Sequence, residues 1–149
     1  MLHERLKPLL DECELRFSHG FAVALHVTFA APRYLHQTYP KAWAKEYTSG
    51  GHVMKDPTVQ WGMKNTGWVR WSDLADPHGV LTRAADFGLR HGSTVSVADD
   101  SGRSLGSFAS PNKPSETSIR YFADLLMRLH LTLDEVPTSE RARGGSIRI

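Results

Sequence analysis

Three aromatic residues stand at four-residue intervals, Tyr39, Trp43 and Tyr47, and the carboxylate of Asp56 follows nine positions later. Residues four apart lie on one face of a helix, so the three rings would point to the same side. Each ring is apolar with one polar group, a hydroxyl or an indole N–H, and Asp56 adds an acceptor for an amide N–H. Such a set can form the wall of a pocket for a small, mainly apolar molecule that carries carbonyl and amide groups.

Core packing explains the same pattern without a ligand. An aromatic stripe on a helix can face the protein interior, and an Asp before Pro57 can serve only as a helix cap. Trp71 offers a flat apolar surface in either case, for a small ring of a ligand or for its neighbours in the core. The spacing of these residues by itself leaves both interpretations open.

The first half of the chain predicts helices around one strand. Helical spacing of apolar residues runs over 2–17, and Pro8 either kinks this helix or stands in its first turn. The segment "FAVALHVTF", 21–29, is typical of a buried strand. A second helix is expected from Pro40, and Asp56 followed by proline predicts the start of a short third one.

The second half predicts a hairpin followed by a long helix. We expect an extended piece over 68–74, a helix over 79–92 that Gly92 closes, and two strands over 93–99 and 103–110. The final helix is expected to start at Pro114 and Ser115. Its apolar stripe is Ile119, Phe122, Leu126, Leu129 and Leu133. This order of elements predicts an α+β fold, an antiparallel sheet with helices packed on it.

Composition excludes several classes of protein. The 149 residues fit one domain, and a net charge of +2 is too small to indicate nucleic-acid binding. The single Cys13 rules out an internal disulfide, and the N-terminus lacks the apolar segment of a secretory signal. No stretch is long and apolar enough for a membrane span, so we expect a cytoplasmic protein.

The joint spacing resembles the autoinducer-binding domain of LuxR-type quorum-sensing regulators. That family shows a Y-P-x-x-W-x-x-x-Y run, an Asp-Pro nine residues after the last Tyr, and a Trp fifteen residues after that Asp. All three intervals hold here, at Tyr39, Trp43, Tyr47, Asp56 and Trp71. The flanking segments "HGFAVALHVTF" and "VLTRAADFGLRHGSTVSV" are also similar, and the resemblance spans roughly residues 15–130.

The resemblance implies a fold, a domain organisation and a ligand. The fold would be an α/β/α sandwich, PAS/GAF-like, with a central antiparallel sheet of about five strands flanked by helices. The autoinducer-binding domain would occupy residues 1–137, followed by a basic flexible tail over 138–149. The ligand would be an N-acyl-homoserine lactone, bound without a cofactor.

The resemblance also implies roles for individual side chains. Trp43 would donate its indole N–H to the lactone carbonyl, Tyr39 would donate to the acyl carbonyl, and Asp56 would accept the amide N–H. Tyr47 and Trp71 would pack on the ligand, the latter near the lactone ring. The full set of expected ligand-binding residues is Tyr39, Trp43, Tyr47, Asp56, Thr58, Trp71 and Ala109. Thr58 would assist near the amide, and Ala109 occupies a pocket-lining position where some members carry a hydroxyl.

In the usual regulator this domain is followed by a DNA-binding helix-turn-helix. Because the chain ends at Ile149 without a recognition helix, we expect no direct DNA binding by this chain. We expect a stand-alone receptor or the sensory part of a longer parent, as a homodimer or as a heterodimer with a full-length LuxR-type regulator, with the last helix as a candidate dimer surface. The alternative is a sensor domain of the same fold that binds a different ligand or none and acts only by such dimerisation.

Two further patterns do not indicate enzymatic chemistry. The segment "GRSLG" fits the G-x-S-x-G pattern of hydrolases, but a polar turn precedes Ser104 and a strand follows it, so a hairpin residue is expected there. The eight histidines are not spaced like zinc ligands, and there is only one cysteine. We therefore predict neither an enzyme nor a metal site.

Overall fold

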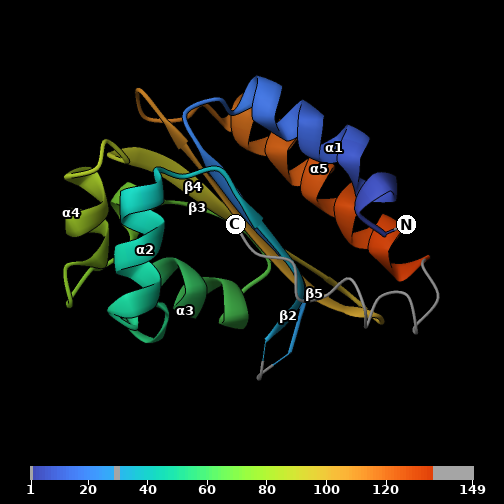
Figure 1. Ribbon diagram of the computed structural model, residues 1–149, viewed down its shortest axis with the longest axis horizontal. Helices are drawn as coiled ribbons and strands as arrows, with labels where there is room; N and C mark the ends of the chain where they lie inside the picture. Colours follow the sequence, from blue (N-terminus) through green and yellow to red (C-terminus); the bar gives the residue numbers. More distant parts are fainter. Residues whose placement is uncertain (1, 29–30, 136–149) are drawn as a thin grey trace.

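The structure, a computed structural model, describes residues 2–28 and 31–135, so the predicted tail over 138–149 lies outside the described residues (Figure 1). Its strands are β1 (Phe21–Val27), β2 (Pro32–Gln37), β3 (Gly67–Arg70), β4 (His91–Asp99) and β5 (Gly102–Ser110). They form one sheet in the order β2-β1-β5-β4-β3, and every neighbouring pair is antiparallel. The predicted antiparallel sheet and the α+β class are confirmed.

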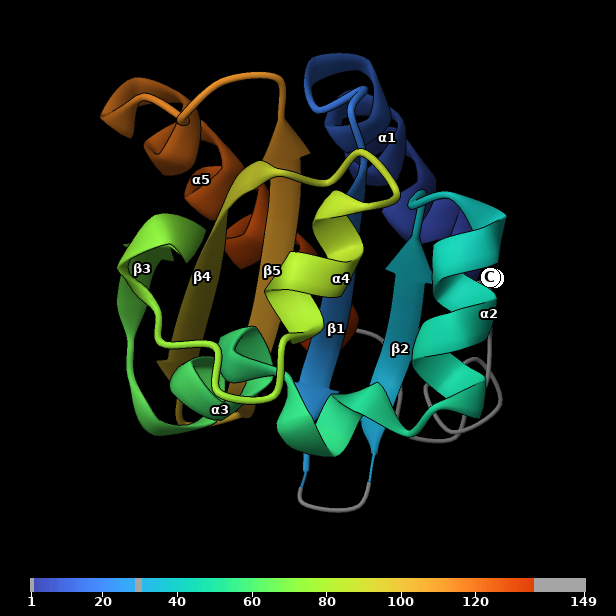
Figure 2. The ribbon, with the colours of Figure 1, turned by 90° about the vertical axis from the view of Figure 1, so that its left-hand side faces the viewer.

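Helices cover both faces of this sheet. The helices are α1 (Leu2–Arg16), α2 (Lys41–Ser49), α3 (Pro57–Lys64), α4 (Val80–Ala85) and α5 (Glu116–Asp134), with two 3₁₀ helices, η1 (His52–Lys55) and η2 (Trp71–Asp73). Helices α1 and α5 lie side by side on one face, and α2, α3 and α4 lie on the other (Figures 1 and 2). The predicted α/β/α sandwich is therefore confirmed.

The main core lies between the sheet and the pair α1 and α5. The whole predicted stripe of α5 is fully buried there, against the inward residues Phe21, Val23 and Leu25 of β1. Gly106 in β5 lets the helix approach closely, because a Cβ atom at this position would lie 2.9 Å from the ring of Phe122. This packing fixes one face of the sheet rigidly and leaves the other face for α2, α3 and α4.

Several predicted boundaries are corrected by the structure. Helix α1 runs continuously through Pro8, so the alternative in which the helix begins there is wrong. The helix predicted over 79–92 ends at Ala85, because Gly88 takes a left-handed φ of 90° and the Leu89 N–H returns to the carbonyl of Ala84. Gly92, predicted to close that helix, lies in β4 instead.

Strand β2 was not predicted as an element. Its sequence, PRYLHQ, combines a proline with charged and polar residues and shows no clear alternation. Antiparallel pairing with the preceding strand β1, from Val27 and Pro32 onward, creates this strand at the edge of the sheet, and its residue types do not show that pairing.

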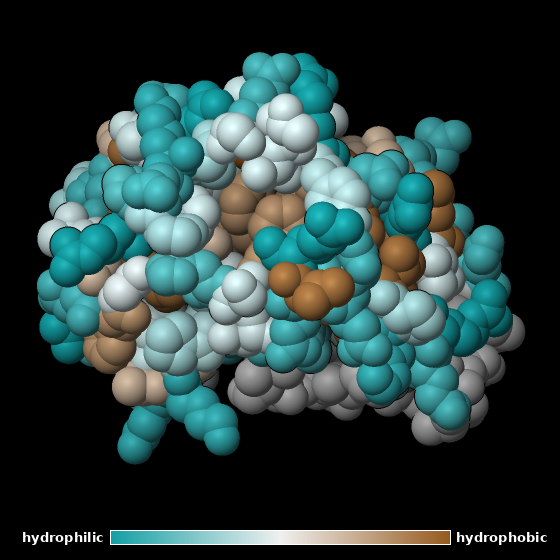
Figure 3. Space-filling model, turned by 90° about the horizontal axis from the view of Figure 1, so that it is seen from above, coloured by the Kyte–Doolittle hydropathy of each residue, from teal (hydrophilic) through white to brown (hydrophobic). Residues whose placement is uncertain are grey.

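The surface of the domain is mainly hydrophilic when seen from above, with a few apolar patches, one of them in a shallow recess (Figure 3). Within the described ranges, no helix is long and apolar enough to cross a membrane.

Candidate functional site

The predicted site residues gather between the sheet and the layer of α2, α3 and α4. Trp43, Trp71 and Ala109 are buried in one apolar cluster, and Tyr39 and Tyr47 pack against it. The cluster is completed by Val80, Ala84 and Leu89, with Leu81 and Phe87 at its margin. The stripe predicted from four-residue spacing therefore faces the sheet, as a pocket wall and a packed core would both require.

Asp56 is the polar centre of this region and also the N-cap of α3. It is only 8% exposed. Its Oδ1 accepts hydrogen bonds from the backbone N–H of Thr58 at 2.8 Å and from the Thr58 hydroxyl at 2.7 Å, and its Oδ2 accepts the hydroxyl of Tyr47 at 2.7 Å. A carboxylate offers about four acceptor positions, so one position on Oδ2 is left for another donor.

The two tyrosines nearest to Asp56 are held as neutral donors. Burial, followed by the negative charge of Asp56, raises the pKa of both Tyr39 and Tyr47. Tyr47 uses its proton on Asp56, whereas the Tyr39 hydroxyl makes no hydrogen bond to any described residue. Tyr39 therefore brings a free donor close to the carboxylate.

Trp43 is enclosed by rings but lacks a polar partner. Its indole is 4% exposed, and ring centroids lie 5.7 Å away in Tyr47, 5.7 Å away in His52 and 5.5 Å away in Phe87. The indole N–H has no hydrogen-bond acceptor in the part of the chain that the structure describes. A buried donor without a partner costs about 1–3 kcal/mol, so this N–H has a strong tendency to take an acceptor.

Trp71 behaves differently from Trp43. Its indole N–H donates to Thr94 Oγ1 at 3.1 Å, and Thr94 Oγ1 lies 2.7 Å from Ser107 Oγ. The ring lies directly on Gly92, where a Cβ atom would come within 2.7 Å of it. Trp71 can therefore offer a ligand only its apolar surface. The sequence did not point to Thr94, although alternation within the predicted strands places Thr94 and Ser107 on the face of the sheet that carries Ala109.

The face of the sheet that carries the aromatic cluster is not fully buried. In β1, residues Ala22 and Ala24 point toward α2, α3 and α4 and are only partly buried, while their neighbours on the opposite face are at 0% exposure. Ser107 of β5 is likewise partly exposed. Small side chains in the two central strands are therefore only partly covered on the face that α2, α3 and α4 occupy.

An ion pair joins the two helices that flank the aromatic cluster. Glu46 of α2 accepts two hydrogen bonds from the guanidinium of Arg83 in α4, at 2.7 and 2.8 Å, which lowers the pKa of Glu46. The Arg83 guanidinium lies 5.0 Å from the ring centroid of Phe87, and the Glu46 carboxylate lies 3.5 Å from His52 Nε2. The ion pair of Glu46 and Arg83 therefore connects α2 to α4 next to Trp43. The spacing of residues along the chain did not predict this contact.

Comparison with known proteins identifies the family. The family of the autoinducer binding domain matches residues 2–136 of the chain. The chain belongs to this family. The quorum-sensing regulator RhlR of Pseudomonas aeruginosa is 33% identical over 82 residues, which cover 53% of this chain and 34% of that regulator. The match thus spans about a third of the length of that curated relative.

Two solved structures share the fold of this autoinducer-binding domain. CepR2 of Burkholderia cenocepacia, an N-acylhomoserine lactone dependent LuxR-family transcription factor, has a TM-score of 0.66 at 16% identity, with 95% of each chain covered. SdiA of Escherichia coli has a TM-score of 0.67 at 20% identity, covering 97% of this chain and 64% of SdiA. RhlR and CepR2 are regulators and not enzymes, in agreement with the prediction from the sequence.

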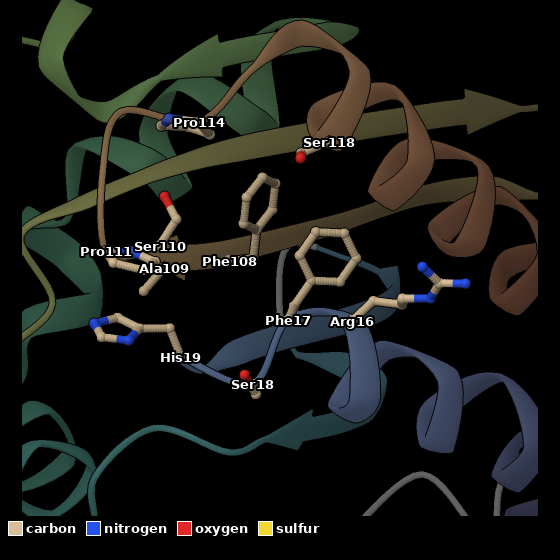
Figure 4. Close-up of a pocket in the computed structure, with 10 residues that line it drawn as sticks. All are labelled: Arg16, Phe17, Ser18, His19, Phe108, Ala109, Ser110, Pro111, Pro114 and Ser118. Carbon is tan, nitrogen blue, oxygen red and sulfur yellow. The ribbon is translucent and has the colours of Figure 1, made fainter.

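A cavity of about 240 Å³ in the autoinducer-binding domain lies apart from the polar cluster (Figure 4). It opens between the α1–β1 turn and the β5–α5 loop, and Ala109 is the one predicted site residue that lines it. The rings of Phe17 and Phe108 form its apolar side, with their centroids 4.6 Å apart. Because neither Trp43 nor Asp56 lines this cavity, it is not the site that the aromatic stripe predicts.

Ser104 takes part in a hydrogen-bonded series that the sequence did not reveal. Its Oγ lies 2.6 Å from His130 Nδ1, and His130 Nε2 lies 2.9 Å from Asp99 Oδ1. The residue types match those of a hydrolase triad. However, Ser104 and His130 are both at 0% exposure, and Ser104 lies within a β-hairpin as predicted, so a substrate has no access to it.

This series instead attaches α5 to the sheet. The ring of His26 stacks on that of His130 with centroids 4.2 Å apart, and His26 Nε2 donates to the backbone carbonyl of His130 at 2.9 Å. His26 has a φ of 52°, a conformation uncommon for a non-glycine residue, at an irregularity in the pairing of β1 with β5. No group of three or more metal-binding side chains is found within the described ranges.

The hydrogen bond between His130 and Asp99 predicts that the stability of the fold decreases at low pH. Hydrogen bonds from His130 and Ser101 lower the pKa of Asp99 below its ordinary value of about 3.9. A depressed carboxyl pKa stabilises the fold above the unfolded pKa, and this contribution is lost as the pH falls through the folded value. Asp99→Asn should therefore melt below the wild type at neutral pH, and the difference in Tm should shrink below about pH 4.

Melting curves between about pH 2.5 and pH 7 would measure this difference. Asp100→Asn is the matched control, because the neighbouring Asp100 carboxylate makes no hydrogen bond or ion pair with any described residue, so the variant should melt like the wild type throughout. A constant difference between Asp99→Asn and the wild type across the whole range would contradict the assigned role of the carboxylate.

Proposed function

We propose that this autoinducer-binding domain binds an N-acyl-homoserine lactone between its sheet and the layer of α2, α3 and α4. One observation carries the proposal. The buried indole N–H of Trp43 has no acceptor among the described residues, and the neighbouring Tyr47, whose ring centroid lies 5.7 Å from that of Trp43, donates to the incompletely used carboxylate of Asp56. A ligand with a carbonyl oxygen and an amide N–H would satisfy both groups at once.

The polar head of the ligand accounts for three side chains. Trp43 donates to the lactone carbonyl, Tyr39 donates its free hydroxyl to the acyl carbonyl, and Asp56 accepts the amide N–H at its remaining Oδ2 position. This assignment pairs both carbonyls and the amide N–H of the head group with a side chain. A ligand without the amide would leave the buried carboxylate underused, which is the basis of selectivity in such sites.

The remaining expected residues hold and cover this arrangement. Both donors of Thr58 are used on Asp56, so Thr58 orients the carboxylate. Tyr47 fixes the other carboxylate oxygen, and Trp71 supplies an apolar surface for the lactone ring. Ala109 is 1% exposed and offers only a methyl group to the pocket.

The acyl tail supplies most of the affinity. An eight-carbon tail buries about six methylene groups at ~0.8 kcal/mol each, or roughly 5 kcal/mol in total. Three hydrogen bonds of the head group add about 1 kcal/mol each, net of water. After the cost of association, the sum is consistent with micromolar or tighter binding. The partly exposed Ala22 and Ala24 offer room for such a tail along the sheet.

A different acyl ligand is the second candidate. SdiA has been solved in complex with octanoyl-rac-glycerol, and that structure has a TM-score of 0.63 at 22% identity to this chain. A glycerol ester keeps the tail and a carbonyl but has no amide N–H for Asp56. It is therefore the informative competitor of the lactone for this domain.

Assembly with a second subunit is part of the proposal, as a homodimer or with a full-length regulator of the same family. The apolar stripe of α5 packs on the sheet and is not free for a partner. A dimer would use outward residues such as Leu131, which is 45% exposed, and Leu15, which is 73% exposed. We propose no DNA contact for the described residues, since one sensory domain accounts for all of them.

Thermal shift with a panel of ligands tests the proposed function. At a hundred times its dissociation constant, a bound lactone adds about 2.7 kcal/mol, which for this size raises Tm by roughly 5–10 °C. Octanoyl-rac-glycerol should give a smaller shift than octanoyl-homoserine lactone at equal concentration. Trp43→Phe should reduce the lactone shift, whereas Trp68→Phe, which changes a tryptophan packed on the opposite face of the sheet, should keep it. A panel from butanoyl to dodecanoyl lactones that leaves Tm unchanged would refute the proposal.

A further inference from the structure

Three side chains form a continuous series of hydrogen bonds on the face of the sheet that the proposed ligand would contact. The indole N–H of Trp71 donates to Thr94 Oγ1 at 3.1 Å, and Thr94 Oγ1 lies 2.7 Å from Ser107 Oγ. Thr94 and Ser107 are direct cross-strand partners in β4 and β5. The series starts at a buried aromatic residue of the candidate site and ends at a hydroxyl that is only partly buried.

The direction of the central hydrogen bond follows from what each hydroxyl needs. Thr94 is 1% exposed, and its oxygen already accepts the Trp71 N–H. If Ser107 donated to Thr94, the Thr94 proton would be buried with no acceptor among the described residues. If Thr94 donates to Ser107, every buried group is satisfied. The favoured direction is therefore Trp71 to Thr94 to Ser107, and the Ser107 proton is left free.

The free proton of Ser107 lies where the sheet is incompletely covered. Ser107 pairs across the strands with Ala22, a small and partly exposed residue on the same face. A donor at the end of an aligned series is strengthened by the bonds behind it. We infer that Ser107 selects autoinducers that carry an acceptor oxygen on the acyl chain, over those with an unsubstituted chain. This inference rests on the proposed function.

The acyl chain is the part of the ligand that needs this donor. Tyr39, Trp43 and Asp56 already account for the acyl carbonyl, the lactone carbonyl and the amide N–H. Ser107 comes from β5, a different element from the helices and the cap that hold the head group. An oxo or hydroxyl oxygen at the third carbon is the next acceptor along such a ligand. When an unsubstituted chain is bound, the Ser107 hydroxyl donates to a water molecule or is left without an acceptor.

Ratios of affinity between matched ligands test the inference. Dissociation constants of octanoyl-, 3-oxo-octanoyl- and 3-hydroxy-octanoyl-homoserine lactone are measured by calorimetry or tryptophan fluorescence for each protein. We expect the wild type to prefer the two oxygenated ligands by about five- to tenfold, the factor that one hydrogen bond supplies. Ser107→Ala should bring this ratio close to one, and Ser107→Thr, which keeps a hydroxyl, should retain the preference.

Ser110→Ala is the matched control. Ser110 lies in the same strand, points to the opposite face and donates to the backbone carbonyl of Asn112 at 2.6 Å, so its loss should leave the ratio unchanged. A wild-type ratio near one, or an equal ratio in wild type and Ser107→Ala, would overturn the inference while the proposed function stands. Failure of all three lactones to bind the wild type would overturn both.

Discussion

Asp56→Asn is expected to lower the affinity for an acyl-homoserine lactone by about a hundredfold while the domain remains folded. An asparagine side chain can still cap α3 and accept the Thr58 N–H with its carbonyl oxygen. Its amide nitrogen then replaces Oδ2, which receives Tyr47 in the structure and the ligand amide in the proposal. A donor facing a ligand N–H replaces a charge-assisted hydrogen bond with an unpaired buried group, a loss of about 3 kcal/mol.

The measurement is a pair of titrations with the same lactone, combined with melting curves without ligand. Asp76→Asn provides the control, because Asp76 accepts the backbone N–H groups of Val80 and Thr82 at the start of α4, and the Asp76 side chain is not itself part of the aromatic cluster. Both variants change a capping carboxylate to an amide, but only the first should lose ligand affinity. Equal dissociation constants for Asp56→Asn and the wild type would remove Asp56 from the binding site.

Gly92→Ala should destabilise the domain by about 3 kcal/mol or more. Gly92 is enclosed in β4 between the backbone of β5 and the ring of Trp71. A Cβ atom there would lie 2.4 Å from the carbonyl oxygen of Phe108 and 2.7 Å from two atoms of the Trp71 ring. Neither neighbour can move alone, since the carbonyl belongs to the central sheet and the indole donates to Thr94. The strand pair or the aromatic cluster must therefore shift.

Urea unfolding at fixed temperature measures this loss, with Gly51→Ala for comparison. Gly51 has a left-handed φ of 65°, but a Cβ atom at that position would have no neighbour within 4 Å. Its substitution should cost only the backbone strain of about 1–2 kcal/mol. If Gly92→Ala were as stable as Gly51→Ala, the tight contact between β4 and Trp71 would not be a real constraint. A stable Gly92→Ala that still responds to ligand would also show that Trp71 can be displaced freely.

The parts of this domain that were predicted from its sequence are those that depend on near neighbours in the chain. Asp56 caps α3 through Thr58, two residues away, and Ser115 caps α5 through Ser118, three residues away. The stripe of α5 and the common face of Tyr39, Trp43 and Tyr47 follow from helical periodicity. Such interactions appear in the sequence because their partners lie within one or two turns of the same element.

The misplaced elements were those whose bounds depend on backbone hydrogen bonds that the pattern of residue types does not show. The helix over 79–92 was extended too far because either glycine could end it, and the hydrogen bond of Leu89 to Ala84 selects Gly88. Gly92 looks like a helix terminator in the sequence. In the structure, its missing side chain instead leaves room for the ring of Trp71 and the carbonyl of Phe108. Strand β2 exists through its pairing with β1.

By itself, then, the sequence determined the aromatic face, the capping carboxylate and the α+β class, all from periodicity, short-range capping and the order of the elements. Only the tertiary structure decided which polar groups of the site are already used. Trp43 and Trp71 are the same residue type, yet Thr94 takes the N–H of Trp71 and no described residue takes that of Trp43. The hydrogen bond of Tyr47 to Asp56, the ion pair of Glu46 and Arg83, and the contact of Thr94 with Ser107 likewise depend on elements that meet only when the chain folds. Hydrogen-bond satisfaction is a property of three-dimensional neighbours, and for that reason no spacing along the chain could specify it.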